Sequence, residues 1–280
     1  IVTASKEKQK NIVLYSAINK FYRKKGIYAP KLIRKHSHDT ILEIEDLGKE
    51  TLLNHVKNSK NKLLLYKKCV DLILKIQKIK PPKKIKISVN KYKKFDTYNL
   101  KNLNKESDLF FDWYLKNNCK KKNFSKLKRK IKNELNNLYK MLYFKNIYFV
   151  HRDFHADNVM VKKKIMGIID SQDAIIGNLL YDVASLVDDV RIKTSNNFKR
   201  LLIKHYLLNT KKINKKEYPN AIQDLSILSI QRNLKILGIF VRLYKRDRKP
   251  NYLKYLPQTW SLLERRMRNP IFNKLKILFK

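Results

Sequence analysis

A short stretch near the middle of the chain constrains the fold more than any other. Three apolar runs of strand length follow one another there, over residues 148–150, 159–161 and 165–169. Polar residues crowd between the first two runs and three lysines separate the last two, which is the pattern of a β-hairpin with a short turn. In a hairpin the start of one strand lies beside the end of the other. Asn158 and Asp170 are therefore expected to meet at its open end.

The side chains around this open end have the chemistry of a phosphoryl-transfer site. The amide of Asn158 and the carboxylate of Asp170 suit Mg²⁺, which prefers oxygen ligands and keeps water or phosphate in its other positions. Asp153, on the loop before Asn158, suits a base that accepts a proton from a hydroxyl. The spacing H-R-D-x-x-x-x-N, beginning at His151 and followed by an acidic metal ligand, is the one protein kinases use. The simpler interpretation is a polar loop with one buried, hydrogen-bonded aspartate.

The charge of the chain needs a separate explanation. The 280 residues carry a formal net charge of +42, from 65 basic and 23 acidic side chains. A basic chain is often a nucleic-acid binder. Here 52 of the 65 basic residues are lysine, spread through every segment together with many Asn and Ile, whereas base and phosphate recognition favours arginine. A biased genome composition explains this pattern better than a nucleic-acid partner, and the positive field would attract an anionic nucleotide.

Targeting signals and cysteines indicate where the protein works. No apolar run approaches the roughly 20 residues that a membrane span requires, and none resembles a signal peptide. The two cysteines, Cys69 and Cys119, form no disulfide framework and fit the reducing cytoplasm, where we expect a monomer. The chain begins at Ile1 without a methionine, so we expect a fragment that lacks its natural N-terminus.

The remaining pattern divides into a small mixed part and a large helical part. Strands are expected over residues 1–4, 31–34 and 41–45, and a helix over residues 6–25 that Gly26 stops. Further helices are expected over residues 63–79, 108–115, 126–142, 180–190, 197–208, 222–243 and 251–267, and a polar connection over residues 83–101. The composition changes from sheet to helix at E-D-L-G, residues 45–48. We therefore predict one domain over residues 1–46 and a second over residues 47–280.

These features together resemble the aminoglycoside phosphotransferase/choline-kinase group of kinase-like folds. More narrowly, H-R-D-F-H-A-D-N-V-M-V, G-I-I-D-S-Q-D-A and Q-R-N-L-K-I-L-G-I-F-V-R-L are similar to the bacterial anomeric N-acetylmuramate/N-acetylglucosamine kinases. The resemblance covers essentially the whole chain. It implies an α+β, protein-kinase-like fold with a small, truncated, β-containing N-lobe and a large, mainly helical C-lobe. It also implies transfer of the γ-phosphate of ATP, with Mg²⁺, to the C1 hydroxyl of an amino sugar recovered from the cell wall.

The resemblance also assigns roles to individual residues. Asp153 would orient and deprotonate the sugar hydroxyl, while Asn158 and Asp170 would hold Mg²⁺ against the β- and γ-phosphates. His151 would order the catalytic loop, and Asp182 would brace it through backbone N–H groups, although a helix N-cap is the simpler interpretation of Asp182.

Contacts to the two substrates follow from the same resemblance. The carbonyl of Glu45 and the N–H of Leu47 would reach the adenine edge from the segment between the lobes. The candidate acceptor-binding residues are Arg152, Gln172, Asp173, Arg232 and Arg242. Gln172 and Asp173 would face sugar hydroxyls or the surroundings of the metal, and a solvated helix face explains the last two arginines equally well.

One part of the kinase pattern is not visible. A glycine-rich loop and a strand lysine paired with a helix glutamate normally hold the phosphates, yet none of the five glycines precedes the first helix. We expect the strands that carry this loop to lie upstream of Ile1. Lys6 and Lys8 are weak candidates for the lysine. This fragment is therefore expected to bind ATP poorly.

Other interpretations compete with an amino-sugar kinase. The acceptor can be an aminoglycoside, choline or another small alcohol, and a choline site would need an aromatic cage from residues such as Trp113 and Trp260. His151 and His155 also permit a zinc or iron site, although no third histidine or cysteine is near in sequence. A pseudokinase is disfavoured because Asp153 and its partners are present. The last alternative is a basic nucleic-acid-binding protein.

Overall fold

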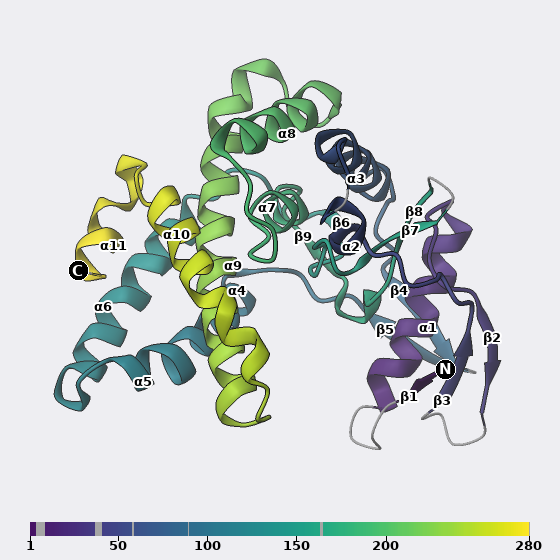
Figure 1. Cartoon of the computed structure of the whole chain (residues 1–280), viewed down its shortest axis with the longest axis horizontal. Coiled ribbons are helices and arrows are strands. Elements are labelled where there is room, and N and C mark those ends of the chain that lie inside the picture. The colour runs from purple at the N-terminus through teal and green to yellow at the C-terminus, as the bar shows by residue number, and fades with distance from the viewer. Residues whose placement is uncertain (4–8, 37–40, 58, 89, 163–164, 280) are drawn as a thin grey trace. The chain divides into compact units, whose positions relative to one another are not determined.

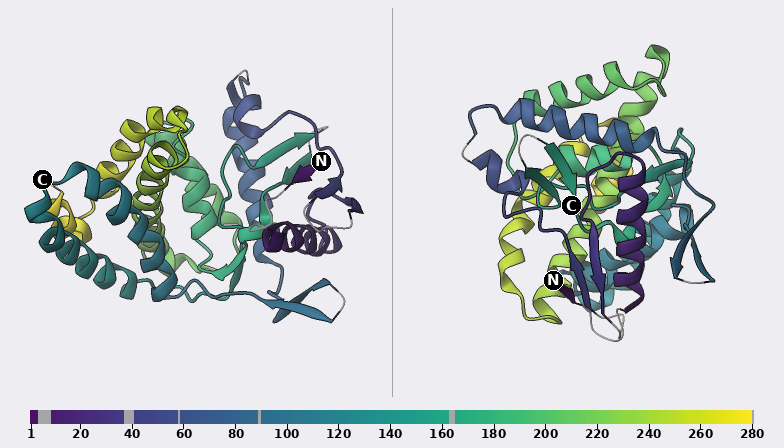
Figure 2. Two further views of the ribbon diagram at one scale, coloured as in Figure 1. Left: turned by 90° about the horizontal axis from the view of Figure 1, so that it is seen from below. Right: turned by 90° about the vertical axis from the view of Figure 1, so that its right-hand side faces the viewer.

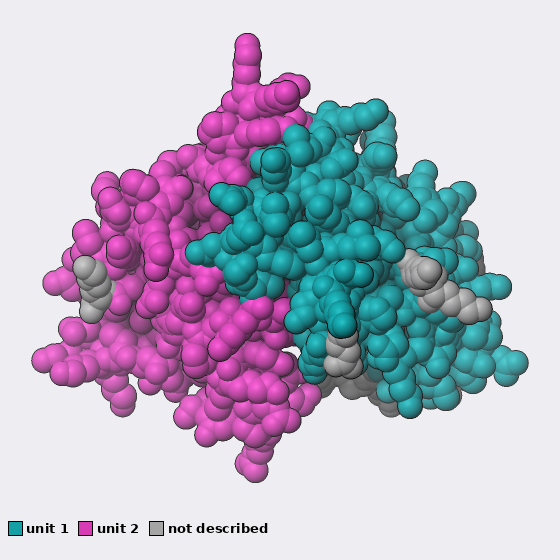
Figure 3. Space-filling view, turned by 45° about the horizontal axis from the view of Figure 1, so that its top comes forward, with its two compact units in different colours: residues 1–97, 146–187, 194–212 teal, residues 98–145, 188–193, 213–280 magenta. Residues whose placement is uncertain are grey.

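The computed structural model of the chain describes residues 1–3, 9–36, 41–57, 59–88, 90–162 and 165–279. The chain forms two compact units (Figure 3). The first unit consists of residues 1–97, 146–187 and 194–212, and the second of residues 98–145, 188–193 and 213–280. These units are made of separate stretches of sequence, whereas the predicted lobes divide the sequence once, between residues 46 and 47. That lobe boundary stays a prediction. Among the described helices, none combines the length and hydropathy that crossing a membrane requires.

A three-stranded antiparallel sheet and one helix open the first unit (Figure 1). The strands are β1 (Val2–Thr3), β2 (Leu32–Lys35) and β3 (Ile41–Ile44), in the spatial order β1-β3-β2. Helix α1 (Gln9–Lys24) lies alongside this sheet (Figure 2). Ile12 and Tyr15 of the helix form a buried cluster with Leu42 of β3. Gly26 follows the helix with a φ of +75°, a conformation that glycine adopts without strain.

The order of elements predicted for this part is confirmed. Helix α1 ends within one residue of the predicted end, β2 is shifted by one residue from the predicted strand, and β3 ends one residue earlier than predicted. The two candidate lysines, Lys6 and Lys8, lie outside the described residues.

The predicted hairpin consists of β7 (Val159–Lys162) and β8 (Ile165–Ile168), which pair antiparallel. Gly167 of β8 lies against Tyr28, because a side-chain carbon at Gly167 would come 2.8 Å from the Tyr28 ring. The preceding strand, β6 (Tyr148–Val150), pairs instead with β9 (Ile175–Gly177). Strand β9 was absent from the sequence prediction.

Residues 83–101 do not form the polar connection that the sequence predicts. Strands β4 (Lys84–Ser88) and β5 (Lys91–Lys94) form an antiparallel hairpin there, and a helix begins at Leu100. Ile85 is buried on β4 while the lysines on either side of it are exposed. The period-two pattern of a strand was therefore present, but lysine hid it.

Four helices complete the first unit. They are α2 (Leu52–Lys57), which was not predicted, α3 (Lys62–Gln77), α7 (Tyr181–Val187) and α8 (Asn196–Asn209). Helices α3 and α8 lie side by side (Figure 2). The Gln77 side chain joins them, donating to the Leu179 carbonyl at 2.6 Å and accepting from the Tyr206 hydroxyl at 2.9 Å. These contacts fix the segment that enters α7.

The second unit is helical. Its helices are α4 (Leu100–Leu109), α5 (Lys116–Asn118), α6 (Lys121–Lys140), α9 (Tyr218–Lys245), α10 (Leu256–Arg266) and α11 (Asn273–Leu278). A π-helical turn, η2 (Phe110–Leu115), joins α4 to α5. The regular helix predicted over residues 108–115 is therefore wrong in type. The helix predicted over residues 251–267 is a 3₁₀ turn, η5 (Pro250–Tyr255), followed by α10.

Gly238 of α9 sits where α4 passes into η2. A side-chain carbon at Gly238 would overlap the Leu109 backbone and lie 2.6 Å from the Phe110 nitrogen. We expect Gly238→Ala to lower the free energy of unfolding by about 3 kcal/mol, because backbone atoms cannot swing aside as a side chain can. Gly26→Ala, which has a positive φ but nothing within 4 Å, should cost about 1 kcal/mol. Equal losses for the two variants in urea denaturation would contradict this account of Gly238.

Candidate active site

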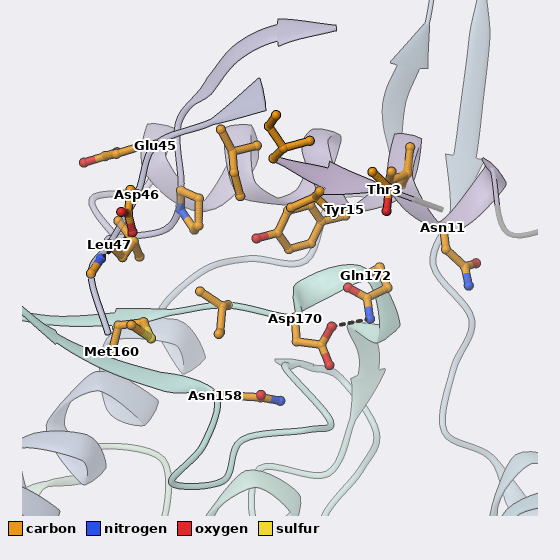
Figure 4. Close-up of a pocket in the computed structure, with 17 residues that line it drawn as sticks. Thr3, Asn11, Tyr15, Glu45, Asp46, Leu47, Asn158, Met160, Asp170 and Gln172 are labelled. Atoms are coloured by element: carbon orange, nitrogen blue, oxygen red, sulfur yellow. Dashed lines mark hydrogen bonds between the residues drawn. The ribbon is translucent and has the colours of Figure 1, made fainter. Parts of the chain in front are cut away.

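The open end of the β7–β8 hairpin brings Asn158 and Asp170 together. Val159 pairs with Ile168 in the hairpin register. Just beyond this pair, the Ile169 N–H donates to the Asn158 carbonyl at 3.0 Å. The Asn158 and Asp170 side chains line the same pocket and lie on the same side of it (Figure 4).

Asp153 belongs to the loop that precedes β7. The Asn158 side-chain nitrogen donates to the Asp153 carbonyl at 3.0 Å. Burial raises the pKa of Asp170, and the negative charge of Asp153 raises that pKa further, whereas hydrogen bonds from Gln172 and Asn158 lower it. Asn158 therefore contacts the Asp153 backbone and the Asp153 charge acts on Asp170, while convergence of the three side chains on one ion stays a prediction.

The oxygen atoms at this point suit Mg²⁺. The Asp170 carboxylate accepts a hydrogen bond from the neutral amide of Gln172 at 2.8 Å, and this bond does not neutralise its charge. A divalent cation held by oxygens of Asn158 and Asp170 would offset both the burial of this carboxylate and the nearby charge of Asp153. In the described part of the chain, no three His, Cys, Asp or Glu side chains cluster at one point.

The Asp182 carboxylate of α7 holds the loop in place. It accepts hydrogen bonds from the N–H of His151 at 2.8 Å and of Arg152 at 3.0 Å, and the residue is 2% exposed. These charge-assisted bonds fix Arg152 at a φ of +76°, which is costly for a residue with a side chain. At the entry to α7, the Asn178 side chain accepts from the Leu180 N–H. Asp182 therefore does more than the helix N-cap considered from the sequence.

The His151 ring ties the loop to the residue before Asp170. Its Nε2 lies 3.0 Å from the Ile169 carbonyl, so this nitrogen carries the proton. The ring is fully buried, with Tyr22 stacked at 6.5 Å between centroids and Phe154 edge-on at 5.9 Å. Burial lowers the pKa of His151 to about 4, although the charge of Asp153 opposes this shift. His151 is therefore neutral at pH 7.

The buried neutral His151 predicts a pH-dependent stability. Its pKa is about 4 in the folded chain against 6.5 in the unfolded chain. The unfolded chain therefore binds the proton more readily, and the stabilisation is fully present above pH 6.5 and lost as the pH falls toward 4. The total loss is about 3 kcal/mol. His151→Gln should lack this component, so its unfolding free energy should fall less between pH 7 and pH 4. Parallel pH profiles for the two proteins would contradict a neutral buried ring.

Side chains also order the segment from Glu45 to Gly48. The Glu45 carboxylate accepts three hydrogen bonds, from Arg23 Nη1 at 2.9 Å, the Tyr28 hydroxyl at 3.0 Å and the Lys31 N–H at 3.2 Å. The Gly48 N–H donates to Asp46 Oδ1 at 2.7 Å. No hydrogen bond of the described residues uses the Leu47 N–H. This donor is available to an adenine edge, and that role stays a prediction for Glu45 and Leu47.

A pocket of about 870 Å³ within the first unit joins this segment to the hairpin end. Leu47 and its neighbours line one part of it, and Asn158, Asp170 and Gln172 line another (Figure 4). Tyr15 of α1 also lines the pocket, with its hydroxyl directed inward. The wall does not include Asp153. The predicted metal ligands and the predicted adenine contacts thus border one cavity.

Three of the candidate acceptor residues have partners near the loop. Arg152 Nη1 lies 3.7 Å from Asp173 Oδ1, and both side chains are partly exposed. Gln172 Nε2 donates to Asp170 Oδ1 at 2.8 Å. Gln172 therefore lies beside the predicted metal ligand, one of the two positions considered from the sequence.

Arg232 and Arg242 belong to α9 of the second unit. Arg232 is buried at 4% exposure and Arg242 is partly buried. Neither side chain is therefore fully solvated, and their contact with an acceptor stays a prediction.

Sequence reasoning missed two buried polar networks in the second unit. Glu106 accepts from Lys235 Nζ at 2.9 Å and from Gln231 Nε2 at 3.0 Å. Asp188 accepts from Arg266 Nε at 2.7 Å and from the Ser229 hydroxyl. The Glu106–Lys235 partners are 129 positions apart, so no local pattern could have revealed them.

Solved structures show which fold the chain adopts. A choline/ethanolamine kinase family protein from Mesorhizobium loti gives a TM-score of 0.64 at 12% identity, covering 96% of this chain and 82% of that chain. An ADP-bound aminoglycoside phosphotransferase gives 0.63 at 14% identity, covering 94% and 84%. The fold is therefore that of the kinase-like phosphotransferases, as predicted.

Sequence comparison then identifies the family. The model of the family described as "Phosphotransferase enzyme family" matches residues 4–216, and the chain belongs to this family. The prediction of a phosphotransferase is confirmed.

Two curated relatives match most of the chain. One from Pseudomonas aeruginosa is 25% identical over 242 residues, which are 85% of this chain and 68% of the relative. One from Caulobacter vibrioides is 25% identical over 263 residues, 91% and 70% of the two chains. Both relatives are named N-acetylmuramate/N-acetylglucosamine kinase. The narrower resemblance seen in the sequence motifs is therefore confirmed.

Proposed function

We propose that the chain transfers the γ-phosphoryl group of ATP, bound with Mg²⁺, to the C1 hydroxyl of an amino sugar such as N-acetylmuramate or N-acetylglucosamine. One observation carries this proposal: Asn158 and Asp170 border the same pocket as the Leu47 segment. A nucleotide in this pocket would place its base at Leu47 and its phosphates at the two oxygen ligands. The names of the relatives support the choice of acceptor.

In the proposed phosphoryl transfer, each residue of the site has a distinct role. Asp153 accepts the proton of the acceptor hydroxyl as the bond from the sugar oxygen to the γ-phosphorus forms and the bond to the β-phosphate oxygen breaks. Asn158 and Asp170 hold the Mg²⁺, which neutralises charge on the β- and γ-phosphates when bound. Asp182 and His151 keep the loop in position for this proton transfer. Positioning and electrostatics supply most of the catalysis in such a reaction.

Other acceptors are less well supported. A choline site needs an aromatic cage, yet the Trp260 indole donates to the Tyr114 hydroxyl at 2.6 Å and packs against Phe279. Trp260 therefore already belongs to an aromatic cluster of the second unit. An aminoglycoside acceptor rests on fold similarity alone.

We also propose that the protein works in the cytoplasm as a monomer, in the recycling of cell-wall amino sugars. Two free cysteines among the described residues support a reducing compartment. The lysines are spread through every segment of the sequence, a pattern that does not single out a nucleic-acid partner.

Phosphorylation of a panel of acceptors tests the proposal. The chain would be incubated with Mg·ATP and N-acetylmuramate, N-acetylglucosamine, choline or an aminoglycoside, and products read by ³¹P NMR. We expect an anomeric phosphate on the amino sugars alone. The methyl glycoside of N-acetylglucosamine, whose C1 oxygen is blocked, is the matched control and should be inert. Phosphate on that glycoside would refute the C1 assignment. Duplex DNA binding that weakens steeply between low and moderate salt, together with no phosphorylation of any acceptor, would instead favour the nucleic-acid-binding alternative.

A further inference from the structure

A buried hydrogen bond fastens helix α1 to the turn that carries Asp170. The Ser171 hydroxyl donates to the Asn19 side-chain oxygen at 2.6 Å. Asn19 is 2% exposed and Ser171 is fully buried. The two residues are 152 positions apart, and Ser171 directly follows Asp170. The bond therefore fixes the residue next to the predicted metal ligand against a separate element of the fold.

The turn needs such an anchor because its backbone is strained. Asp170 has a φ of +62°, and the 3₁₀ turn η3 (Ser171–Asp173) follows at once. Within the turn, Gln172 donates to the Asp170 carboxylate at 2.8 Å, and this bond is exposed. A hydrogen bond between two residues of the same turn can orient the Asp170 carboxylate, but it cannot fix the position of the turn relative to the rest of the fold. The Ser171–Asn19 bond is long-range and buried, so it does place the turn.

Tyr15, on the same helix as Asn19, lines the pocket. It lies one helical turn before Asn19, on the same face of α1, and its hydroxyl is directed into the cavity (Figure 4). Burial raises the pKa of Tyr15, the Asn19 amide lowers it, and the charge of Asp170 raises it. The Asn19 nitrogen is buried and makes no hydrogen bond of regular geometry with the described residues. Asn19 thus lies between a pocket-lining hydroxyl and the Asp170 turn.

We propose that Asn19 and Ser171 are positioning residues that hold the Asp170 carboxylate where the nucleotide-bound cation needs it. This inference rests on the proposed function, because it assumes that Asp170 binds Mg²⁺. Groups that orient a metal ligand typically change metal affinity by about 10- to 100-fold when removed. The competing explanation is that the bond only packs α1 against η3. The two explanations differ in whether the Mg²⁺ dependence changes.

Calorimetry with a non-hydrolysable ATP analogue at a series of Mg²⁺ concentrations tests the proposal. In Ser171→Ala we expect the Mg²⁺ concentration for half-maximal nucleotide binding to rise about tenfold. Nucleotide affinity without Mg²⁺ should stay within about twofold. Asn19→Leu, which removes the acceptor at similar size, should give the same rise, and the double variant should add nothing further.

The matched control is Ser107→Ala. Ser107 is also buried, and its hydroxyl donates to the Leu103 carbonyl at 3.1 Å in the second unit. The Ser107→Ala variant should lower the melting temperature without changing the Mg²⁺ dependence of nucleotide binding. If Ser171→Ala and Asn19→Leu behave like this control, while Asp170→Asn abolishes the Mg²⁺ effect, the positioning role is overturned and the proposed function stands. If Asp170→Asn leaves the Mg²⁺ effect intact, both are overturned. Should Ser171→Ala not fold, Asn19→Leu decides the result.

Discussion

Asp153→Asn should lower kcat for amino-sugar phosphorylation by about 1,000-fold, because the amide cannot accept the proton of the attacking hydroxyl. Nucleotide affinity should stay within about twofold, since Asp153 is not part of the pocket wall that Leu47, Asn158 and Asp170 line. The melting temperature should change little, because Asp182 and His151 hold the loop through other atoms. Steady-state kinetics with Mg·ATP and N-acetylmuramate measures the effect.

Asp157→Asn is the matched control for this variant. It removes one negative charge from the same loop, at an exposed side chain. Its kcat should stay within about twofold of the parent value, because a solvent-exposed charge is screened and acts only weakly on the phosphoryl transfer. Comparable losses in the two variants would mean that charge alone, and not proton acceptance by Asp153, explains the result.

Asp170→Asn should abolish the gain in nucleotide affinity that Mg²⁺ provides, a loss of about 100-fold or more, because the charged metal ligand is gone. The same change should leave the metal-free melting temperature equal or higher. Burial and the charge of Asp153 raise the pKa of Asp170, so the folded chain binds a proton here more readily than the unfolded chain. The carboxylate therefore lowers stability once the pH rises above the unfolded pKa, and a neutral amide removes that cost.

Calorimetry and thermal unfolding in the presence of EDTA separate these two effects. A lower metal-free melting temperature together with unchanged Mg²⁺ dependence would mean that Asp170 is a structural residue. The charge-matched Asp157→Asn variant should change neither quantity.

The part of the site that depends on local register was predictable from the sequence. Two apolar runs with a lysine turn define the β7–β8 hairpin, and antiparallel pairing then places Asn158 beside Asp170. The loop that carries Asp153 directly precedes Asn158 in the sequence, so its place near the open end of the hairpin was also predictable. Periodicity likewise located most helices, such as α3 and α9, because a buried helical face repeats every 3.6 residues.

Long-range contacts were not predictable from one sequence. The β6–β9 pairing and the Asn19–Ser171 bond join segments whose composition gives no sign of the partner. The close approach of Gly238 to Leu109, where η2 begins, becomes visible only in three dimensions. Strand β4 was missed for a different reason, since exposed lysines on its outer face concealed the alternation around Ile85.

The most direct test of the central claim is the location of the cation itself. A crystal of the chain grown with Mn²⁺ and a non-hydrolysable ATP analogue would show the metal by its anomalous scattering. We predict one peak in the pocket at about 2.1 Å from oxygens of both Asn158 and Asp170, with the analogue's base at Leu47. A metal bound away from these two side chains, or Asn158 and Asp170 pointing to different places around the nucleotide, would contradict the account.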